Sequence, residues 1–225
     1  MRAARPSGLV IFDCDGVLVD SEPISLAVTL EVLAEAGCPL DLSTGYARFL
    51  GRSLASVAQW LREEHGVDLD DALKARLRAR LFQRFKAELR PIPGVAEAVR
   101  ALPCPACVAS SSQPDRIRLS LDLTELLPLF DPNIFSATMV DRGKPAPDLF
   151  LLAASRMGVA PADCVVVEDS PPGIRAAQSA GMRVVGFVGG AHAEPADLHQ
   201  AVANLAPDAI ISDMAELPAI VQGTA

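Results

Sequence analysis

The architecture of this chain can be predicted from one segment, Leu9-Val-Ile-Phe-Asp-Cys-Asp-Gly-Val-Leu-Val-Asp20. Its first residues are apolar, as in a short buried strand, and Asp13 and Asp15 follow where that strand would end. Alternate side chains of a strand share a face, so both carboxylates would point into one small volume. Two like charges this close are costly unless a cation compensates them, and Mg²⁺ prefers carboxylate oxygens. A pair of turn aspartates without a cation is the alternative interpretation.

Further short apolar segments follow and alternate with helical patterns. The expected strands are residues 106–110, 133–137, 164–167, 183–188 and 209–211. Most are continuous apolar runs, which are typical of strands buried on both faces. The expected helices are residues 95–102, 115–126, 148–157 and 174–180. This alternation predicts an α/β fold with a doubly wound parallel sheet.

The connection between the first two strands breaks this alternation. It is about ninety residues long, far more than one crossover needs. Residues 21–89 show helical spacing, most clearly in a stripe of Leu73, Leu77, Leu81, Phe85 and Leu89. We therefore predict an inserted α-helical cap over residues 20–90. The α/β core would comprise residues 1–19 and 91–225, with hinges near Asp20 and residues 90–94.

Composition limits the classes of function. The net charge is −8 and 50% of the residues are hydrophobic, so the chain is globular and lacks the basic stripe of a nucleic-acid binder. No apolar run approaches the roughly 20 residues that span a bilayer. Residues 1–6 carry charge with no apolar region after them, unlike a signal peptide. With five cysteines, an odd number, we expect reduced thiols, a cytoplasmic location and no membrane partner.

Polar residues follow the other predicted strands where ligands gather in open α/β sheets. They are Ser110-Ser-Ser112, Glu168-Asp169, and Lys144 just before a helix. Taken singly, they could be a loop, a helix start and a surface lysine. Together they suit phosphoryl transfer, because a carboxylate can attack phosphorus while a lysine and a hydroxyl hold the other oxygens. A second acid can protonate the leaving group.

These motifs resemble those of the haloacid dehalogenase superfamily of phosphohydrolases. The insertion is similar to the helical cap of its β-phosphoglucomutase-like and phosphogluconate-phosphatase-like group. The resemblance implies that Asp13 is the nucleophile and a Mg²⁺ ligand, and that Asp15 is the general acid/base whose carbonyl also binds Mg²⁺. It further implies a phosphate site of Ser110, Ser111 and Lys144, and a Mg²⁺ site completed by Asp169 and Glu168.

Three further residues, an arginine and two histidines, lie outside these motifs. Arg52, in the loop Gly51-Arg52-Ser53, lies where the family places a specificity loop and could contact a phosphate or a sugar carboxylate. An exposed arginine at a helix start is the alternative. His192 and His199 have no spacing that suits a metal site, so we expect both on the surface.

These observations favour a Mg²⁺-dependent phosphatase that acts on a small phosphorylated sugar or sugar acid, its only expected partner, and works as a monomer. A hexose phosphomutase is the first alternative, but Ser25 stands where the β-phosphoglucomutase pattern has a histidine. That difference favours hydrolysis. A metal-independent dehalogenase and a phosphate-accepting receiver module are further alternatives.

Overall fold

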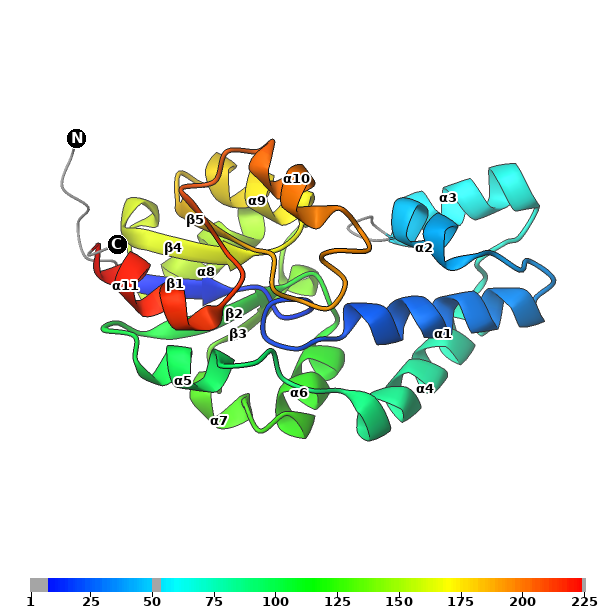
Figure 1. The fold of residues 1–225 in the computed structure, drawn as a ribbon, viewed down its shortest axis with the longest axis horizontal. Coiled ribbons are helices and arrows are strands. Elements are labelled where there is room, and N and C mark those ends of the chain that lie inside the picture. Colours follow the sequence, from blue (N-terminus) through cyan, green and yellow to red (C-terminus); the bar gives the residue numbers. More distant parts are fainter. Residues whose placement is uncertain (1–7, 50–53, 224–225) are drawn as a thin grey trace.

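The computed structural model describes residues 8–49 and 54–223. Within these residues, six parallel strands form one sheet in the order β3-β2-β1-β4-β5-β6 (Figure 1). The strands are β1 (Leu9–Phe12), β2 (Ala106–Ser110), β3 (Ile134–Ser136), β4 (Cys164–Glu168), β5 (Arg183–Phe187) and β6 (Ala209–Ile211). The predicted doubly wound α/β fold is confirmed, and each predicted strand end is right to within one residue.

Helices cover both faces of the sheet. One face carries α5 (Val95–Arg100), α6 (Pro114–Leu123), α7 (Leu127–Phe130) and α11 (Leu217–Gln222). The other carries α8 (Asp148–Met157), α9 (Pro171–Ser179) and α10 (Leu198–Ala203). Short 3-10 turns occupy Ala137–Met139, Pro161–Asp163 and Met214–Glu216.

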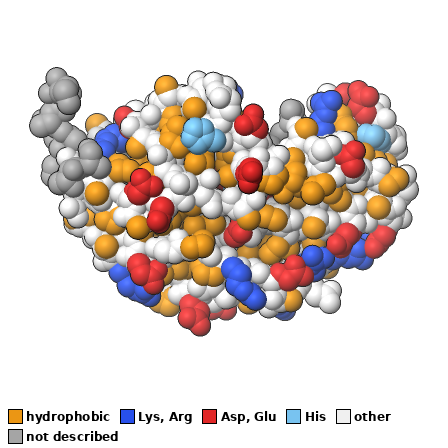
Figure 2. All heavy atoms as spheres, in the orientation of Figure 1, with side chains coloured by type: hydrophobic (Ala, Val, Ile, Leu, Met, Phe, Trp, Pro, Cys, Tyr) orange, Lys and Arg blue, Asp and Glu red, His pale blue; other side chains and the backbone are white. Residues whose placement is uncertain are grey.

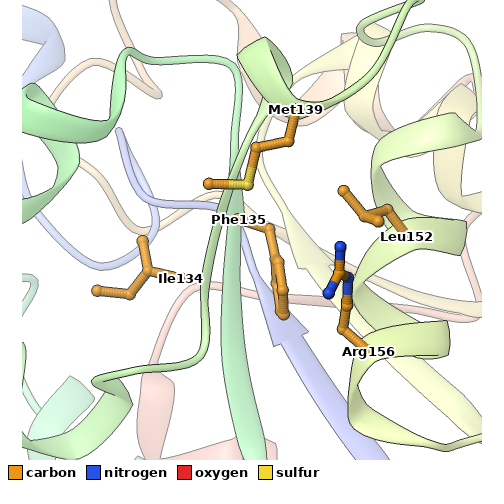
Figure 3. A pocket seen from close by; sticks show the side chains of 5 residues that line it. All are labelled: Ile134, Phe135, Met139, Leu152 and Arg156. Atoms are coloured by element: carbon orange, nitrogen blue, oxygen red, sulfur yellow. The ribbon is translucent and has the colours of Figure 1, made fainter.

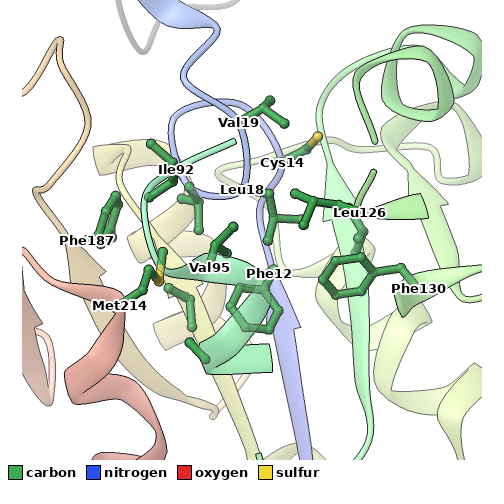
Figure 4. Packing of buried hydrophobic residues seen from close by; sticks show 14 of the residues in the cluster. Phe12, Cys14, Leu18, Val19, Ile92, Val95, Leu126, Phe130, Phe187 and Met214 are labelled. Atoms are coloured by element: carbon green, nitrogen blue, oxygen red, sulfur yellow. The ribbon is translucent and has the colours of Figure 1, made fainter. Parts of the chain in front are cut away.

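Strand β1 is buried on both faces because its side chains alternate between two cores. Val10 and Phe12 belong to the core under α5 and α6, whereas Leu9 and Ile11 belong to the core under α8 and α9. Phe12 packs edge-to-face on Phe130 with ring centroids 5.8 Å apart (Figure 4). The carboxyl end of β1 is thereby held rigidly in the middle of the sheet.

The insertion between β1 and β2 is helical. It contains α1 (Glu22–Glu35), α2 (Leu42–Phe49), α3 (Leu54–His65) and α4 (Asp71–Glu88). Asp41 accepts a hydrogen bond from Thr44 N at the start of α2. Figure 1 shows α1 and α4 running side by side away from the sheet, with α2 and α3 above them. A small core of their own joins them, made of Leu33, Cys38, Val57 and Leu61.

Charged side chains cover the outer surface of the α1/α4 pair. Arg80 pairs with Glu35 at 2.6 Å and Arg84 with Glu31 at 2.9 Å. Figure 2 shows blue and red side chains alternating along this edge of the molecule. The arrangement explains why α4 buries few of its side chains, since one side packs on α1 and the other faces solvent. No helix in the described part of the chain is long and apolar enough to cross a membrane.

Two chain segments connect the helical insertion to the sheet, and they lie next to each other. Asp20 N donates to Arg90 O at 3.0 Å, and Ile92 N donates to Leu18 O at 2.9 Å. Val19 and Pro91 form an antiparallel bridge between them. The predicted hinge positions therefore lie side by side. The predicted specificity residue Arg52 lies outside the described residues.

Candidate active site

The turn after β1 presents Asp13 and Asp15. Asp13 N donates to Val167 O of β4 at 3.0 Å, which continues the sheet pairing by one residue. The chain then turns at Gly16, whose φ is +80°. A Cβ at Gly16 would lie 2.1 Å from Asp169 Oδ2, so only glycine fits between the two motifs. The turn therefore brings the end of β1 against the end of β4.

Lys144 connects the end of β1 with the end of β4. Its Nζ lies 2.5 Å from Asp13 Oδ1 and 2.8 Å from Glu168 Oε1, and it also donates to Ala109 O at 3.0 Å. The lysine side chain is only 3% exposed. Burial opposes its charge, but the Asp13 and Glu168 carboxylates outweigh that effect and raise the pKa of Lys144. The structure therefore places the Lys144 ammonium group beside Asp13, in surroundings that favour its charged form.

The surroundings of Asp13 carry an excess of negative charge. Burial raises the pKa of Asp13 well above its usual value; Lys144 lowers it, and the charges of Glu168 and Asp169 raise it again. A single lysine thus faces a cluster of three carboxyl groups. This imbalance is what a bound cation would correct.

Glu168 is held by the first turn of α9. Its Oε2 accepts hydrogen bonds from Ser170 N at 2.7 Å and from Ser170 Oγ at 2.9 Å. A Cβ at Gly173 would lie 1.6 Å from Glu168 Oε1, so the helix must have glycine there. With Lys144 on the other oxygen, both Glu168 oxygens have protein donors. In this arrangement Glu168 orients Lys144.

Asp15 occupies a different environment. Ser21 Oγ and Arg116 Nη2 lie 2.6 and 2.7 Å from its Oδ1, and Ser112 Oγ lies 2.6 Å from its Oδ2. Burial alone would raise the pKa of Asp15, but the Arg116 charge and the serine hydroxyls outweigh burial and lower it. Sequence reasoning gave no role to Arg116, because a lone arginine in a helix has no local signal.

The serines after β2 play different parts. Ser110 is buried and its Oγ accepts from Ser112 N at 3.1 Å, whereas Ser111 is exposed. Ser136 Oγ, at the end of β3, donates to Ser112 O at 2.7 Å and fixes the loop. Ser112 contacts Asp15, so the hydroxyl cluster serves the acid/base candidate as well as the predicted phosphate site.

The position of His192 differs from the one predicted from the sequence. The prediction of a surface residue was wrong, because the side chain is only 1% exposed and Nε2 lies 2.9 Å from Asp169 Oδ2. Burial alone would lower the pKa of His192. The hydrogen bond to Asp169 and the charge of that carboxylate outweigh burial, so the net pKa is raised. The loop after β5 folds back over the turn of β1 through Gly190, a path that has no signature in the sequence. His199 is exposed, as predicted.

The carboxylates suit a small cation that binds oxygen. Within residues 8–49 and 54–223, no three histidine, cysteine, aspartate or glutamate side chains form a complete metal-binding group. Mg²⁺, however, is usually held by one or two protein carboxylates, with waters and substrate oxygens completing its shell. Asp13 and Asp169 supply two such carboxylates. Lys144 and His192 each engage one oxygen of this pair, so the donor set fits such a cation.

A cavity of about 310 Å³ lies elsewhere, outside edge strand β3 (Figure 3). Its lining residues are Ile134, Phe135, Met139, Leu152 and Arg156. None of them belongs to the carboxylate cluster, and the lining is mostly apolar. The carboxylate cluster and this cavity are therefore separate regions of the molecule.

Comparisons with known proteins agree with this geometry. A family model described as haloacid dehalogenase-like hydrolase matches residues 8–181. The 6-phosphogluconate phosphatase of Escherichia coli (strain K12) is 34% identical over 187 residues, which cover 83% of this chain and 85% of that protein. A haloacid dehalogenase-like protein of unknown function from Agrobacterium tumefaciens is 38% identical, with a TM-score of 0.83 and coverage of 96% of this chain and 97% of that one. A HAD family hydrolase from Deinococcus radiodurans R1, solved with bound phosphate and sodium, is 34% identical, with a TM-score of 0.77 and coverage of 97% and 96%. The chain belongs to the haloacid dehalogenase-like hydrolase family, as its motifs predicted.

Proposed function

We propose that this chain is a Mg²⁺-dependent phosphatase that hydrolyses a small phosphorylated sugar or sugar acid through a phosphoaspartate at Asp13. One observation carries the proposal: Asp13 and Asp15 lie two residues apart but have opposite surroundings. Asp13 contacts a lysine inside a carboxylate cluster, whereas Asp15 contacts an arginine and two hydroxyls. Paired carboxylates with environments that differ in this way are suited to different chemical roles.

In the first half of the reaction, an Asp13 oxygen forms a bond to phosphorus and the ester P–O bond breaks. This step requires Asp15 to hold a proton in the substrate complex, although Arg116 and the serine hydroxyls lower its pKa in the free chain. Asp15 then gives that proton to the departing alkoxide. Lys144 neutralises charge on the transferring group, and Ser110 and Ser111 are the proposed hydroxyl contacts. Mg²⁺, held by Asp13 and Asp169 with the Asp15 carbonyl, and fixed by Glu168 through its shell, would supply charge neutralisation for the phosphoryl oxygens.

In the second half, a water oxygen bonds to phosphorus while Asp15 accepts the water proton. The bond between phosphorus and Asp13 breaks, inorganic phosphate leaves, and both side chains return to their starting states. Glu168 keeps Lys144 in place throughout, through the 2.8 Å contact of Lys144 Nζ with Oε1. Each bond formed is thus matched by one broken, and no further reactant is required.

Hydrolysis is favoured over a phosphomutase reaction by the surroundings of Ser25. Its hydroxyl lies 3.2 Å from Arg116 Nη2 and cannot donate or accept protons near neutral pH as a histidine would. The names of relatives support the substrate class, since 6-phosphogluconate is a phosphorylated sugar acid. The phosphate bound in the Deinococcus structure supports an anion site in this fold.

We also propose that residues 20–90 act as a cap that opens and closes over the strand ends. The paired connections at Asp20 and Arg90 support this assignment, because the insertion meets the sheet through two adjacent segments. A disulfide engineered between α4 and α6 tests it. Turnover should fall when the disulfide forms and return on reduction, whereas unchanged turnover in the oxidised protein would contradict a moving cap.

Phosphate release is the direct test of the activity. The purified chain is assayed with 6-phosphogluconate, hexose phosphates and nucleotides, each with Mg²⁺ and with a chelator. We expect release from a sugar or sugar-acid phosphate that stops in chelator and recovers with Mg²⁺. Full activity in chelator would contradict the metal requirement, and isomerised sugar phosphate without free phosphate would favour the mutase.

A further inference from the structure

Arg116 lies at the junction between the sheet and the helical insertion. It projects from α6, and its Nη2 lies 2.7 Å from Asp15 Oδ1 and 3.2 Å from Ser25 Oγ on α1. Its guanidinium carbon lies 5.4 Å from the ring centroid of Phe85 on α4. One side chain from the core therefore contacts the acid/base candidate and the two helices that connect the insertion to the sheet.

Stability alone does not explain this burial. The side chains of Arg116 and Asp15 are 23% and 13% exposed, so both charges have lost most of their water. Arg116 Nε is buried and has no hydrogen-bond partner among the described residues. A buried ion pair rarely stabilises a protein more than apolar side chains would, and an unpaired donor lowers the gain further. The arrangement therefore points to a role in the reaction.

The geometry of the contact suggests which role. Ser21, Ser112 and Arg116 come from three different segments and together fix both oxygens of Asp15. Arg116 also contacts α1 through Ser25 and α4 through Phe85, and Ser21 lies at the start of α1. A carboxylate that delivers a proton must be placed within hydrogen-bond reach of the leaving oxygen. A shift of α1 or α4 would move the arginine, and with it the carboxylate.

We propose that Arg116 is a positioning residue for Asp15, which aligns the acid/base carboxylate with the leaving-group oxygen when α1 and α4 are seated. This inference rests on the proposed phosphatase function. It predicts that Arg116 matters most where the leaving group needs a proton. An alkoxide leaving from a sugar phosphate needs one, whereas p-nitrophenolate is stable without it.

The test compares two esters, 6-phosphogluconate and p-nitrophenyl phosphate, through kcat/KM. This ratio covers binding and the departure of the leaving group, but excludes later hydrolysis of the phosphoaspartate. Arg116→Ala should lower kcat/KM about 100-fold for 6-phosphogluconate and less than about 5-fold for p-nitrophenyl phosphate. Arg116→Lys, which keeps the charge but loses the planar fork, should recover roughly tenfold for the sugar ester.

Arg118→Ala is the matched control. Arg118 lies on the same helix and pairs with exposed Asp131 at 2.8 Å, so its removal should change neither ester by more than about twofold. Equal losses of Arg116→Ala on both esters would show a merely structural or binding role and overturn the proposal, as would no loss at all. If thermal unfolding shows that Arg116→Ala does not fold, Arg116→Lys against wild type makes the same comparison. Failure of the wild type to release phosphate from either ester with Mg²⁺ would instead contradict the proposed function.

Discussion

The surroundings of Asp13 and Asp15 differ, although the two residues follow the same strand. Around Asp13, burial and the carboxyl groups of Glu168 and Asp169 raise its pKa against the single charge of Lys144. Around Asp15, Arg116 and the hydroxyls of neighbouring serines lower the pKa despite burial. The first region has an excess of negative charge that a cation would offset, whereas the second is balanced without one. Charge balance, and not position on the strand, therefore separates the surroundings of these two carboxyl groups.

Removal of the proposed nucleophile has the largest expected effect in the Asp13 region. Asp13→Asn should lower phosphate release by at least about 10⁴-fold, because the amide cannot form the phosphoaspartate. Thermal unfolding should show an intact fold, since the change removes a charge from a crowded cluster. Steady turnover by this variant, beyond any trace of wild-type enzyme, would contradict the assigned role.

Asp15→Asn tests the other region. With a sugar phosphate, turnover should fall by roughly 10²–10⁴-fold, because leaving-group protonation and water activation are both lost. With p-nitrophenyl phosphate, the first half of the reaction should persist and phosphorylated protein should accumulate, which intact-mass measurement would detect. Equal loss with both esters and no trapped phosphate would place Asp15 outside acid/base chemistry.

Lys144→Met tests the surroundings of Asp13 through both activity and stability. Activity should fall by roughly 10²–10³-fold, because the ammonium charge that neutralises the phosphoryl oxygens in the proposed reaction is lost. Without metal, the unfolding free energy should fall by about 3 kcal/mol, because Asp13 and Glu168 lose their buried partner. Urea unfolding in chelator measures this loss, and added Mg²⁺ should restore part of it.

The control for Lys144 is Lys74→Met. Lys74 pairs with Asp71 at 3.2 Å in solvent on α4, so stability should change by less than about 0.5 kcal/mol. Similar losses in the two variants would mean that the carboxylate cluster does not depend on its lysine.

Glu22 faces both regions, and its expected effect is on stability alone. Burial, with the charges of Asp15 and Asp169, raises its pKa to about 7, although Arg116 and His192 act in the opposite direction. A carboxyl group with a higher pKa in the folded chain binds more protons there, so its contribution to stability falls as pH rises from about 4.5 to 7. Glu22→Gln should therefore be more stable than wild type at pH 8 by up to about 3 kcal/mol, and nearly equal at pH 4.5. Urea unfolding in chelator at these two pH values measures the difference, and an identical pH profile for the two proteins would contradict it.

The sequence allowed the sheet and much of the candidate site to be predicted. Buried strands of a parallel sheet are continuous apolar runs, so their positions were right to within one residue. Asp13, Lys144, Glu168 and Asp169 were predictable because each lies at the end of a strand or shortly before a helix, at an edge where the ends of parallel strands gather. Short motifs of this kind can be recognised from neighbouring residues alone.

Other contributors had no such local signal. Arg116 meets Asp15 across 101 residues of sequence, and nothing near either residue indicates the contact. His192 is buried because Gly16 and Gly190 leave room for its ring, so that its loop packs on the turn of β1 and the imidazole reaches Asp169. Ser112 was part of the predicted hydroxyl cluster, but its contact with Asp15 required the coordinates.

The amino-acid order by itself determined which groups stand at the ends of the strands, because backbone pairing and apolar burial act over a few residues at a time. Tertiary structure alone decided how those groups share charge, because the energy of a buried carboxylate depends on every partner within a few ångströms. The distinction between Asp13 and Asp15 is of this second kind. It comes from a lysine 131 residues away on one side and an arginine 101 residues away on the other.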